Sequence, residues 1–463
     1  MRYVSTRGEA PELGFEDVLL SGLARDGGLY VPAVWPQLSS RDITHLQGKS
    51  YEDIAYAVMH PFIGGAVPDH DLKQMIAAAY ASFGHPAVAP LKQLDDNQWL
   101  LELFHGPTLA FKDVAMQLLS RLMDWALARR RSRATIVGAT SGDTGGAAIE
   151  AFQASQHASI FMLHPHGRVS DVQRRQMTTV AAPSVHNIAL EGNFDDCQAI
   201  VKALFNDLAF RDTIGLAGVN SINWARIMAQ VVYYVSAAVS LGAPGRAVSF
   251  CVPTGNFGDI FAGFVAKRMG LPIDRLVIAT NVNDIIDRTL KTGHYETRGV
   301  KPSTSPSMDI QVSSNFERLL YEVHARDPYA VRRLMHNLQQ AGSFTIGNRE
   351  LDQIRHEFDS GATDEAATAA TIRETLAATG ELLDPHTAVG YAVARKSAPS
   401  SSPMVTLATA HPAKFPDAVE KASGTRPGLP PRLAHLMTAP ERFTVLPNDV
   451  ARVRDFILSH QAR

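Results

Sequence analysis

A single lysine adjoins an apolar tripeptide in the stretch ELFHGPTLAFKDVAMQLL, which spans residues 102–119. Lys112 follows Leu109, Ala110 and Phe111 and stands where apolar residues begin to recur at helical spacing. Lysine normally lies at the surface, with its stem over apolar neighbours and its ammonium in water. An amine held against an apolar wall can instead attack a carbonyl group and form a Schiff base. Lys112 is therefore a candidate nucleophile, and an exposed amine at a helix start is the alternative.

Two glycine-rich turns follow apolar, strand-like segments and could bind anions. GATSGDTGGAA (138–148) holds four glycines together with Ser141 and Thr144, and VPTGNFGDIFAG (252–263) brackets an Asn-Phe pair with glycines. Small residues leave backbone amides free, and the positive end of the following helix attracts a carboxylate or a phosphate. The second turn has neither G-x-G-x-x-G nor G-K-[ST], so it is not a dinucleotide or nucleoside-triphosphate motif. A tight connection without a ligand is the alternative for each turn.

A third turn, LATAHPAKFPDAV (407–419), passes from an apolar strand through Thr409 and His411 to Lys414. By itself this segment is best interpreted as a strand end followed by a helix that begins at a proline. Together with Lys112 and the two anion-binding turns, its hydroxyl at a strand end fits a different purpose. The combination is typical of a phosphorylated cofactor held by a Schiff base.

The elements that must position these residues alternate between about residues 113 and 280. Short apolar strands separated by helices predict an α/β fold, in which a parallel sheet has helices on both faces and binds ligands at the carboxyl ends of its strands. Mixed signals over the first 90 or so residues indicate an added N-terminal region. The predicted strands are 134–139, 159–165, 185–190, 215–220, 247–254 and 275–280, and the predicted helices are 113–130, from about 146, from about 170, 194–208, 223–241 and 258–269.

Length and composition exclude several classes of protein. A chain of 463 residues predicts two or three domains. Hydrophobic residues make up 45% and charged residues 19%, without an apolar run of the roughly 18 to 20 residues that a membrane helix needs, so we expect a soluble protein with no membrane partner. A net charge of −2 argues against nucleic acid as a partner, and RRRSR (129–133) is interpreted as a solvated helix end.

The N-terminus lacks the apolar segment of a signal peptide, and the chain has only two cysteines, Cys197 and Cys251. Both observations favour a cytoplasmic location. The cysteines lack metal-type spacing, so we interpret them as buried structural thiols and expect no metal site. Two Ser/Pro-rich loops, 298–309 and 397–403, are too short for disordered linkers, and no internal repeat is evident.

Five of these motifs, taken together, resemble the threonine synthase family. The motifs are FHGPTLAFKD, GATSGDTGGAA, VPTGNFGDIFAG, SMDIQVSSNFERLLYE (307–322) and TAHPAKFPDAV, and the longer microbial form of the family also carries DGGLYVP (26–32). The resemblance keeps the order of the motifs and covers nearly the whole chain. It implies the fold type II group of pyridoxal-phosphate enzymes, with two open, twisted sheets of parallel type flanked by helices and an N-terminal extension.

That resemblance also implies a division into domains and a set of site residues. We expect an N-terminal region (1–95), a smaller α/β domain (96–215) and a larger α/β domain (216–463). Lys112 would form the Schiff base with pyridoxal 5'-phosphate, with its pKa lowered by Phe111 and by nearby positive charge. The phosphate of the cofactor would bind to Gly255, Asn256, Phe257, Gly258 and Asp259, its pyridine nitrogen to Thr409, and the carboxylate of the substrate to the turn of Ser141, Gly142, Asp143, Thr144 and Gly145.

The activity that the resemblance implies converts O-phospho-L-homoserine and water to L-threonine and phosphate. Phosphate would leave by β,γ-elimination, water would add at Cβ, and Lys112 is the candidate base. Because Thr409 is neutral, it would leave the cofactor ring a milder electron sink than an aspartate would. The phosphate of the substrate needs its own cations, for which Lys414 is the first candidate and Arg226 the next.

Several further residues keep both a functional and a structural interpretation. Arg174 and Arg175 could bind the substrate phosphate or could be solvated on a helix surface. His105 could orient a loop over the site or cap it, and we favour the site, whereas we expect His386 to cap a helix. A monomer is expected from the resemblance.

Three other activities are considered beside threonine synthesis. A phospholyase or a serine/threonine dehydratase of the same fold would release ammonia and a keto acid. The segments TAHPAKF and SMDIQVSSNFERLLYE favour the synthase. A binding protein that had lost turnover is disfavoured by Lys112, since binding alone needs no Schiff-base lysine.

Overall fold

Six strands form the larger of two sheets in this computed structural model, which describes residues 1–397 and 400–461. Every neighbouring pair is parallel except the antiparallel pair β3–β4 at one edge. The inner strands β9 and β14 are buried along their whole length, as expected of a parallel sheet covered on both faces. In spatial order the strands are β13 (Phe358–Ala362), β10 (Ile273–Thr280), β9 (Val248–Pro253), β14 (Met404–Ala408), β4 (Gln98–Glu102) and β3 (Leu91–Asp95).

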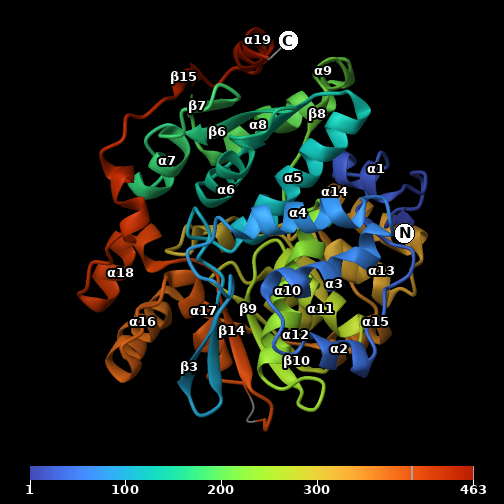
Figure 1. Cartoon of the computed structure of the whole chain (residues 1–463), viewed down its shortest axis with the longest axis vertical. Coiled ribbons are helices and arrows are strands. Elements are labelled where there is room, and N and C mark those ends of the chain that lie inside the picture. The colour runs from blue at the N-terminus through green and yellow to red at the C-terminus, as the bar shows by residue number, and fades with distance from the viewer. Residues whose placement is uncertain (398–399, 462–463) are drawn as a thin grey trace.

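The smaller sheet has five strands, all parallel, and lies at the top of Figure 1. Its central strand β6 is buried at every position. In spatial order the strands are β15 (Thr444–Pro447), β7 (Val185–Glu191), β6 (Ala158–Pro165), β5 (Ala134–Ala139) and β8 (Leu216–Ala217). Two sheets of mainly parallel strands, with flanking helices, confirm the predicted fold class.

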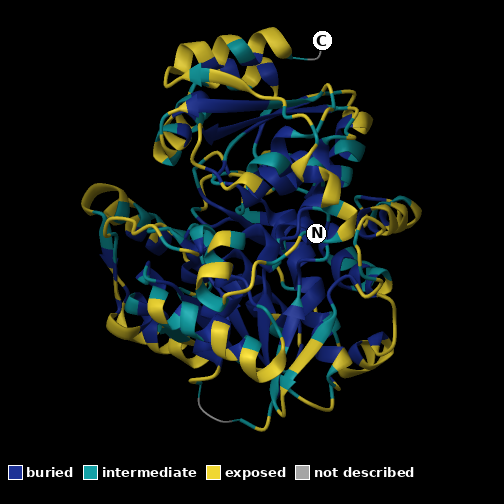
Figure 2. Ribbon diagram, turned by 90° about the vertical axis from the view of Figure 1, so that its left-hand side faces the viewer, coloured by how far each residue is buried: buried dark blue, intermediate teal, exposed yellow. Residues whose placement is uncertain are grey.

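Helices cover both sheets, and in Figure 2 the dark blue buried residues lie inside the molecule while the yellow exposed residues lie outside. The remaining short strands form two antiparallel pairs, β1 (Tyr3–Ser5) with β2 (Tyr30–Pro32) and β11 (His294–Glu296) with β12 (Ser343–Thr345). The helices are α1 (Phe15–Ser21), α2 (Ser40–Leu46), α3 (Tyr51–Ile63), α4 (Asp69–Tyr80), α5 (Lys112–Arg130), α6 (Asp143–Phe152), α7 (Asp171–Thr178), α8 (Phe194–Asn206), α9 (Leu208–Ile214), α10 (Trp224–Ser240), α11 (Gly258–Arg268), α12 (Ile285–Thr292), α13 (Phe316–Val323), α14 (Pro328–Ala341), α15 (Asn348–Glu357), α16 (Glu365–Thr379), α17 (Pro385–Ala394), α18 (Pro416–Ser423) and α19 (Val450–His460), with 3-10 turns η1 (Pro306–Met308), η2 (Pro412–Lys414) and η3 (Pro431–Met437).

Two predicted elements differ from the structure in an informative way. The helix expected over 194–208 is α8, which ends at Asn206, and a second helix, α9, follows it because the side chain of Asp207 caps α9 by accepting a hydrogen bond from the amide of Phe210. The strand expected over 215–220 is only the two-residue β8, at the edge of its sheet. The predicted loop 298–309 contains the turn η1, and part of the loop 397–403 lies outside the described residues.

The sheets do not follow the expected domain ranges strand by strand. β4 lies within the range assigned to the smaller domain but pairs with β14 in the larger sheet. β15, near the end of the chain, returns to pair with β7 in the smaller sheet. The division into 1–95, 96–215 and 216–463 therefore stays a prediction about domains, whereas four strands, β3, β4, β8 and β15, belong to a sheet outside their expected range.

The N-terminal region packs on the buried helix α10 (Figure 1). Tyr3 is fully buried, its ring lies 5.9 Å from that of Trp224, and its hydroxyl donates to the carbonyl of Phe62 at 2.7 Å. Phe62 of α3 also contacts Trp224, with 5.6 Å between the rings. An aromatic cluster of this kind joins the N-terminal region to the main core.

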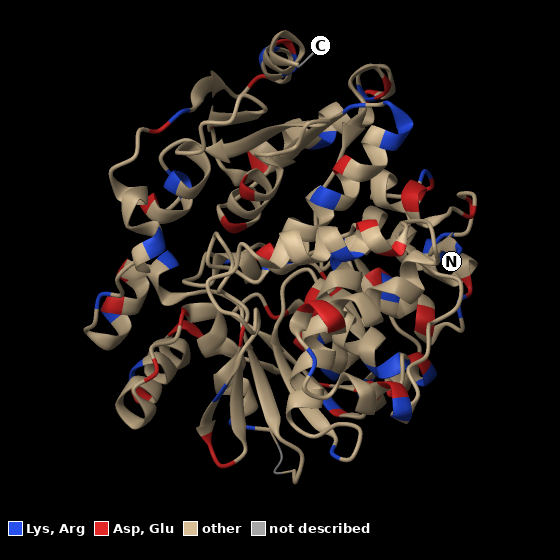
Figure 3. Cartoon of the chain, viewed as in Figure 1, with Lys and Arg blue, Asp and Glu red and all other residues tan. Residues whose placement is uncertain are grey.

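Lys, Arg, Asp and Glu residues are spread over many helices and loops of the chain, as the blue and red segments of Figure 3 show. Among residues 1–397 and 400–461, no helix has the length and apolarity needed to cross a membrane. Both cysteines are buried and free, which confirms the interpretation of Cys197 and Cys251 as buried thiols.

Arg318 is an exception to this charge distribution, because its guanidinium is completely buried. It donates twice to the carbonyl of Tyr30, at 3.0 and 3.1 Å, and once to the carbonyl of Ile222 at 2.6 Å. A fourth hydrogen bond reaches the side chain of Asn315. Burial lowers the pKa of Arg318 to about 9. The side chain thus ties the N-terminal strand β2 and the segment before α10 to α13.

We predict that Arg318→Met destabilises the protein, because it leaves several buried oxygens without a donor. The expected loss is about 3 kcal/mol in the free energy of unfolding, seen as a lower melting temperature. Arg298→Met is the control, since the Arg298 side chain is 62% exposed and pairs with Glu296 at the surface. Equal melting temperatures for the two variants would contradict this assignment.

Candidate active site

A cavity of about 1000 Å³ lies where strands of both sheets end. Ala139 at the end of β5, Pro253 at the end of β9 and Thr409 just after β14 all line it. This is the edge of a parallel sheet at which ligands are expected. The cavity brings together ten residues predicted from separate motifs: Lys112, Asp143, Thr144, Arg226, Gly255, Asn256, Phe257, Gly258, Asp259 and Thr409.

Lys112 is placed by a tightly tied loop just before α5. The buried carboxylate of Asp113 accepts hydrogen bonds from the amide and the hydroxyl of Thr108, both at 2.7 Å. Gly106 must be a glycine, since a Cβ there would lie 2.4 Å from the Cβ of Asp113. The amide of Phe111 donates to the carbonyl of Thr409 at 2.8 Å. Asp113 therefore does more than begin the helix, because it also fixes the loop that presents Lys112.

The amine of Lys112 is buried in the cavity wall, and the residue is 7% exposed. Its Nζ lies 3.1 Å from the hydroxyl of Ser307, 3.3 Å from Oδ2 of Asp143 and 5.0 Å from the centre of the Phe111 ring. Burial lowers the pKa of Lys112; the charge of Asp143 opposes this shift, and the nearby Lys414 adds to it. The predicted direction of the pKa shift is confirmed, although burial is its main cause.

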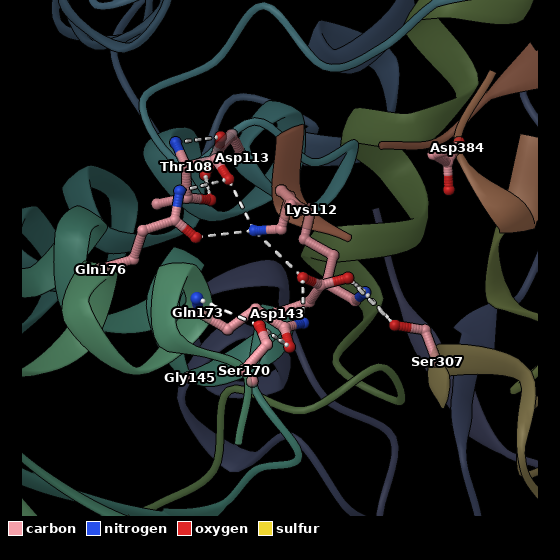
Figure 4. Close-up of polar contacts among 12 residues, drawn as sticks. Thr108, Lys112, Asp113, Asp143, Gly145, Ser170, Gln173, Gln176, Ser307 and Asp384 are labelled. Carbon is pink, nitrogen blue, oxygen red and sulfur yellow. Dashed lines mark hydrogen bonds and ion pairs between the residues drawn. The ribbon is translucent and has the colours of Figure 1, made fainter. Parts of the chain in front are cut away.

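Asp143 lies between Lys112 and Lys414, and Figure 4 labels Asp143 and Lys112. Its Oδ1 is 3.0 Å from Nζ of Lys414 and accepts from the amide of Gln173 at 2.9 Å. Burial alone would raise the pKa of Asp143, but Lys414 and Lys112 hold it well below the ordinary value for an aspartate. The carboxylate of Asp143 is therefore ionised and paired.

Lys414 lies behind the cavity and does not line it. Its side chain has no exposed surface. Besides Asp143, its Nζ donates to the carbonyl of Thr108 at 2.7 Å and to Oε1 of Gln176 at 2.8 Å, so its three donors are used. In this arrangement Lys414 contacts Asp143 and the loop before α5, and it would have to give up a buried partner to reach a substrate phosphate.

The turn before α6 is held open by one threonine. The hydroxyl of Thr140 accepts from the amides of Gly142 and Gly145, both at 2.9 Å. The amides of Ser141, Asp143 and Thr144 have no acceptor among the described residues. Gly142 has φ +143°, and a Cβ there would lie 2.6 Å from the amide carbon of Gln173. Asp143 and Thr144 line the cavity, whereas Ser141 and Gly142 form the turn behind them.

The turn before α11 has the same kind of free amides. No acceptor within the described part of the chain pairs with the amides of the four residues from Asn256 to Asp259. The carbonyl of Asn256 is occupied by Asn315, and that of Gly255 by the hydroxyl of Ser313. Phe257 adopts φ +63° and is buried. Four amides at the positive end of a helix form a site for an anion.

Arg226 and Asp259 add one buried charge of each sign to this turn. Nε of Arg226 has no hydrogen-bond partner in the described part of the chain, and burial lowers the pKa of this arginine to about 10. Asp259 accepts from the hydroxyls of Tyr233 and Tyr234, while its Oδ2 is without a partner among the described residues. Burial raises the pKa of Asp259 to about 6, although the two tyrosines oppose the shift.

Ser307 and His386 contact the site but were assigned no such place from the sequence. The amide of Ser307 donates to Nε2 of His386 at 3.2 Å, and both residues line the cavity. The expectation that His386 caps a helix is wrong, because Asp384 is the cap of α17 and accepts from the amides of His386 and Thr387. Ser307 opens the motif SMDIQVSSNFERLLYE, which was the available signal for it.

Three other candidates lie away from the cavity. His105 pairs with Glu102 at 2.7 Å and lines a separate hollow together with His411. Arg174 and Arg175 both contact Glu441, at 2.8 and 3.5 Å. The two arginines join α7 to the C-terminal segment.

These residues fit pyridoxal phosphate, the cofactor expected from the sequence. The turn before α11 offers free amides to a phosphate, and a Cβ at Gly255 would lie 2.7 Å from the carbonyl oxygen of Ser307, so the glycine keeps the turn compact. Arg226 lines the same cavity as that turn, and its buried Nε donates to none of the described residues. Lys112 supplies a buried amine with a lowered pKa.

The fold and these residues define a pyridoxal-phosphate-dependent enzyme of fold type II. The family model of that class matches residues 85–410. The models "Threonine synthase N terminus" and "Threonine synthase, C-terminal" match residues 2–80 and 387–457.

Named relatives agree with the family models over the whole chain. A threonine synthase of Pseudomonas aeruginosa is 55% identical over 100% of this chain and 99% of its own length. The crystal structure of a threonine synthase from Brucella melitensis with bound pyridoxal phosphate is 62% identical, covers 100% of both chains and has a TM-score of 0.98. A threonine synthase structure from yeast is 39% identical, covers 99% of this chain and 98% of its own, and has a TM-score of 0.94. The chain belongs to the threonine synthase family.

Removal of the charge of Asp143 should lower the pKa of Lys112 further, because that charge opposes the effect of burial. We therefore expect Asp143→Asn to shift the pH midpoint for labelling of Lys112 by an amine reagent to lower pH. Labelling would be followed by mass spectrometry in protein freed of cofactor. Asp171→Asn is the control, since Asp171 is exposed and pairs with Arg174. An unchanged or higher midpoint in Asp143→Asn would show that Asp143 does not set this pKa.

Proposed function

We propose that this chain converts O-phospho-L-homoserine and water to L-threonine and phosphate, the last step of threonine biosynthesis, with pyridoxal 5'-phosphate as cofactor. The observation that carries the proposal is one cavity that joins the Lys112 amine to two turns with free amides. A substrate with both a carboxylate and a phosphate needs more than one anion site. Membership of the threonine synthase family supports this choice of substrate.

The two turns divide the anions between them. The amides of the turn before α11, from Gly255 to Asp259, bind the cofactor phosphate in this proposal. The turn of Ser141 to Thr144 binds the carboxylate of the substrate through its free amides. Asp143 would repel that carboxylate, but Lys112 and Lys414 offset its charge at 3.3 and 3.0 Å. Lys414 thus contributes to the carboxylate site through Asp143.

Proton transfer is assigned to Nζ of Lys112. Bound pyridoxal phosphate withdraws electrons from an attached amino acid and so makes its α-proton easier to remove. The lowered pKa of Lys112 raises the fraction of free amine that can accept this proton. Asp143 and Ser307 hold the amine at the cavity wall. The burial of these groups keeps bulk water from competing for the proton.

Thr409 is assigned to the pyridine nitrogen of the cofactor. It lies just after β14 and lines the cavity, and its carbonyl is already used by the amide of Phe111. Its hydroxyl can donate a hydrogen bond without a change of charge. A neutral partner leaves the ring nitrogen unprotonated and moderates its withdrawal of electrons.

Arg226 is the cation in the cavity best placed for a phosphate. It is buried, it lines the cavity and its Nε has no partner among the described residues. Lys414 remains a second candidate only if its contacts with Thr108 and Gln176 are released.

We also propose that the enzyme acts as a monomer in the cytoplasm, without nucleic acid or membrane partners.

Product analysis tests this function directly. We expect protein loaded with pyridoxal phosphate to show a visible absorption band and to form threonine and phosphate in equal amounts from O-phospho-L-homoserine. Lys112→Ala should lose both the band and the activity, because no other amine replaces the Schiff base. Ammonia and 2-oxobutyrate in place of threonine would instead identify a phospholyase or a dehydratase. A wild-type protein that cannot be reconstituted with pyridoxal phosphate would refute the cofactor assignment.

Arg226→Gln should weaken phosphate binding, since a charge-assisted hydrogen bond is lost. We expect the constant that describes binding of that phosphate, KM or Kd, to rise about tenfold or more. If Arg226 holds the substrate phosphate, KM for O-phospho-L-homoserine rises; if it holds that of the cofactor, Kd for pyridoxal phosphate rises. Both constants would be measured by titration, with Arg168→Gln, at an exposed position outside the cavity, as the control. The assignment fails if neither constant changes.

A further inference from the structure

The hydroxyl of Ser307 bridges the two charged groups at the centre of the site. It accepts a hydrogen bond from Nζ of Lys112 at 3.1 Å and donates one to Oδ2 of Asp143 at 3.0 Å (Figure 4). A hydroxyl has one proton to donate, so donation to the carboxylate leaves its lone pairs to face the amine. Ser307 therefore contacts both members of the Lys112–Asp143 pair.

The backbone of Ser307 is held on two further sides. Its amide donates to Nε2 of His386 at 3.2 Å. Its carbonyl oxygen lies against the turn before α11, where a Cβ at Gly255 would approach it to 2.7 Å. Ser307 thus contacts Lys112, Asp143 and the turn before α11 that we propose to bind the cofactor phosphate.

His386 is itself fixed in one tautomer. Its Nδ1 lies 2.8 Å from Oδ1 of Asp384, and its ring packs 4.9 Å from that of Phe415. Because Nε2 accepts from the amide of Ser307, the ring proton belongs on Nδ1, where Asp384 accepts it. Asp384 is 1% exposed and also caps α17. The pair Asp384–His386 is therefore a rigid support for Ser307.

The loop that carries Ser307 is stabilised from its other end by Asp309. Oδ1 of Asp309 accepts from the side-chain amides of Asn281 and Asn283, at 2.8 and 3.0 Å. Its Oδ2 accepts from the amide of Ser303 at 2.9 Å. These contacts order the loop without any contribution from Lys112.

We propose that Ser307 is a positioning residue for the amine of Lys112, supported by the Asp384–His386 pair. Its hydroxyl keeps the free amine beside the cavity whenever Lys112 is not bound to the cofactor. This inference rests on the proposed function, since it concerns the lysine of that same site. Ser307 acts through Lys112, so its loss changes the rate at which the amine reacts.

The reaction of cofactor-free protein with pyridoxal phosphate tests this role without any substrate. We expect Ser307→Ala to slow the appearance of the visible band in a stopped-flow experiment about tenfold, because the hydrogen bond that positions the amine is lost. Ser307→Thr keeps the hydroxyl and should restore the rate to within about twofold of the wild type. His386→Leu removes the acceptor for the Ser307 amide and should also slow the appearance of the band. Thr304→Ala is the matched control, since Thr304 is an exposed residue of the same loop and should react like the wild type.

Turnover gives a second and independent measurement. In Ser307→Ala, kcat should fall while KM for O-phospho-L-homoserine stays within about twofold, because the hydroxyl holds the amine and not the substrate. The inference is overturned if folded Ser307→Ala reacts with pyridoxal phosphate as fast as the wild type, or if Ser307→Thr is as slow as Ser307→Ala. If Ser307→Ala does not fold, a wild-type rate in His386→Leu overturns the inference. Failure of the wild type to make threonine would refute the proposed function but would leave the stopped-flow comparison intact.

Discussion

The buried carboxylate of Asp143, held between Lys112 and Lys414, is the interaction on which the rest of the site depends. Three ionisable groups out of water are costly unless they are paired and hydrogen-bonded. The lysines keep the pKa of Asp143 low despite its burial, and Asp143 in turn opposes the effect of burial on Lys112. Since the three residues come from α6, α5 and η2, one carboxylate also joins segments that lie far apart in the chain.

The arrangement of the two sheets explains how such distant segments meet. β4 pairs with β14 in the larger sheet, although the helix α5 that follows it packs on α6 beside the smaller sheet. The loop between β4 and α5 must therefore cross from one sheet to the other, and Lys112 lies at the end of that crossing. Thr409, just after β14, accepts from the amide of Phe111 and so fixes the same crossing from the other strand. A strict division of the chain at residue 216 would separate β4 from β9 and β14 of the sheet that anchors this loop.

Local patterns predicted much of this structure, and long-range pairings account for the rest. The parallel strands, the turn of Gly255 to Asp259 and the position of Lys112 follow from periodicity and glycine spacing within short windows. The contact of Lys414 with Thr108 spans 306 residues, and no local pattern reports a partner at that distance. The cap of α17 was open to prediction, since an aspartate before a proline is a common helix start and Asp384 precedes Pro385.

The turn before α11, which we propose to bind the cofactor phosphate, contains the carboxyl group of Asp259. Asp259 is the second residue of α11, and its pKa is raised to about 6. At neutral pH a negative carboxylate there would oppose a phosphate, yet the hydroxyls of Tyr233 and Tyr234 direct their protons to Asp259 and reduce its field. Arg226 contributes one positive charge to the same cavity. Arg7, Lys112, Lys202 and Arg332 also line the cavity. The oriented backbone amides add an attraction for phosphate that needs no excess of basic residues, which agrees with a chain whose net charge is only −2.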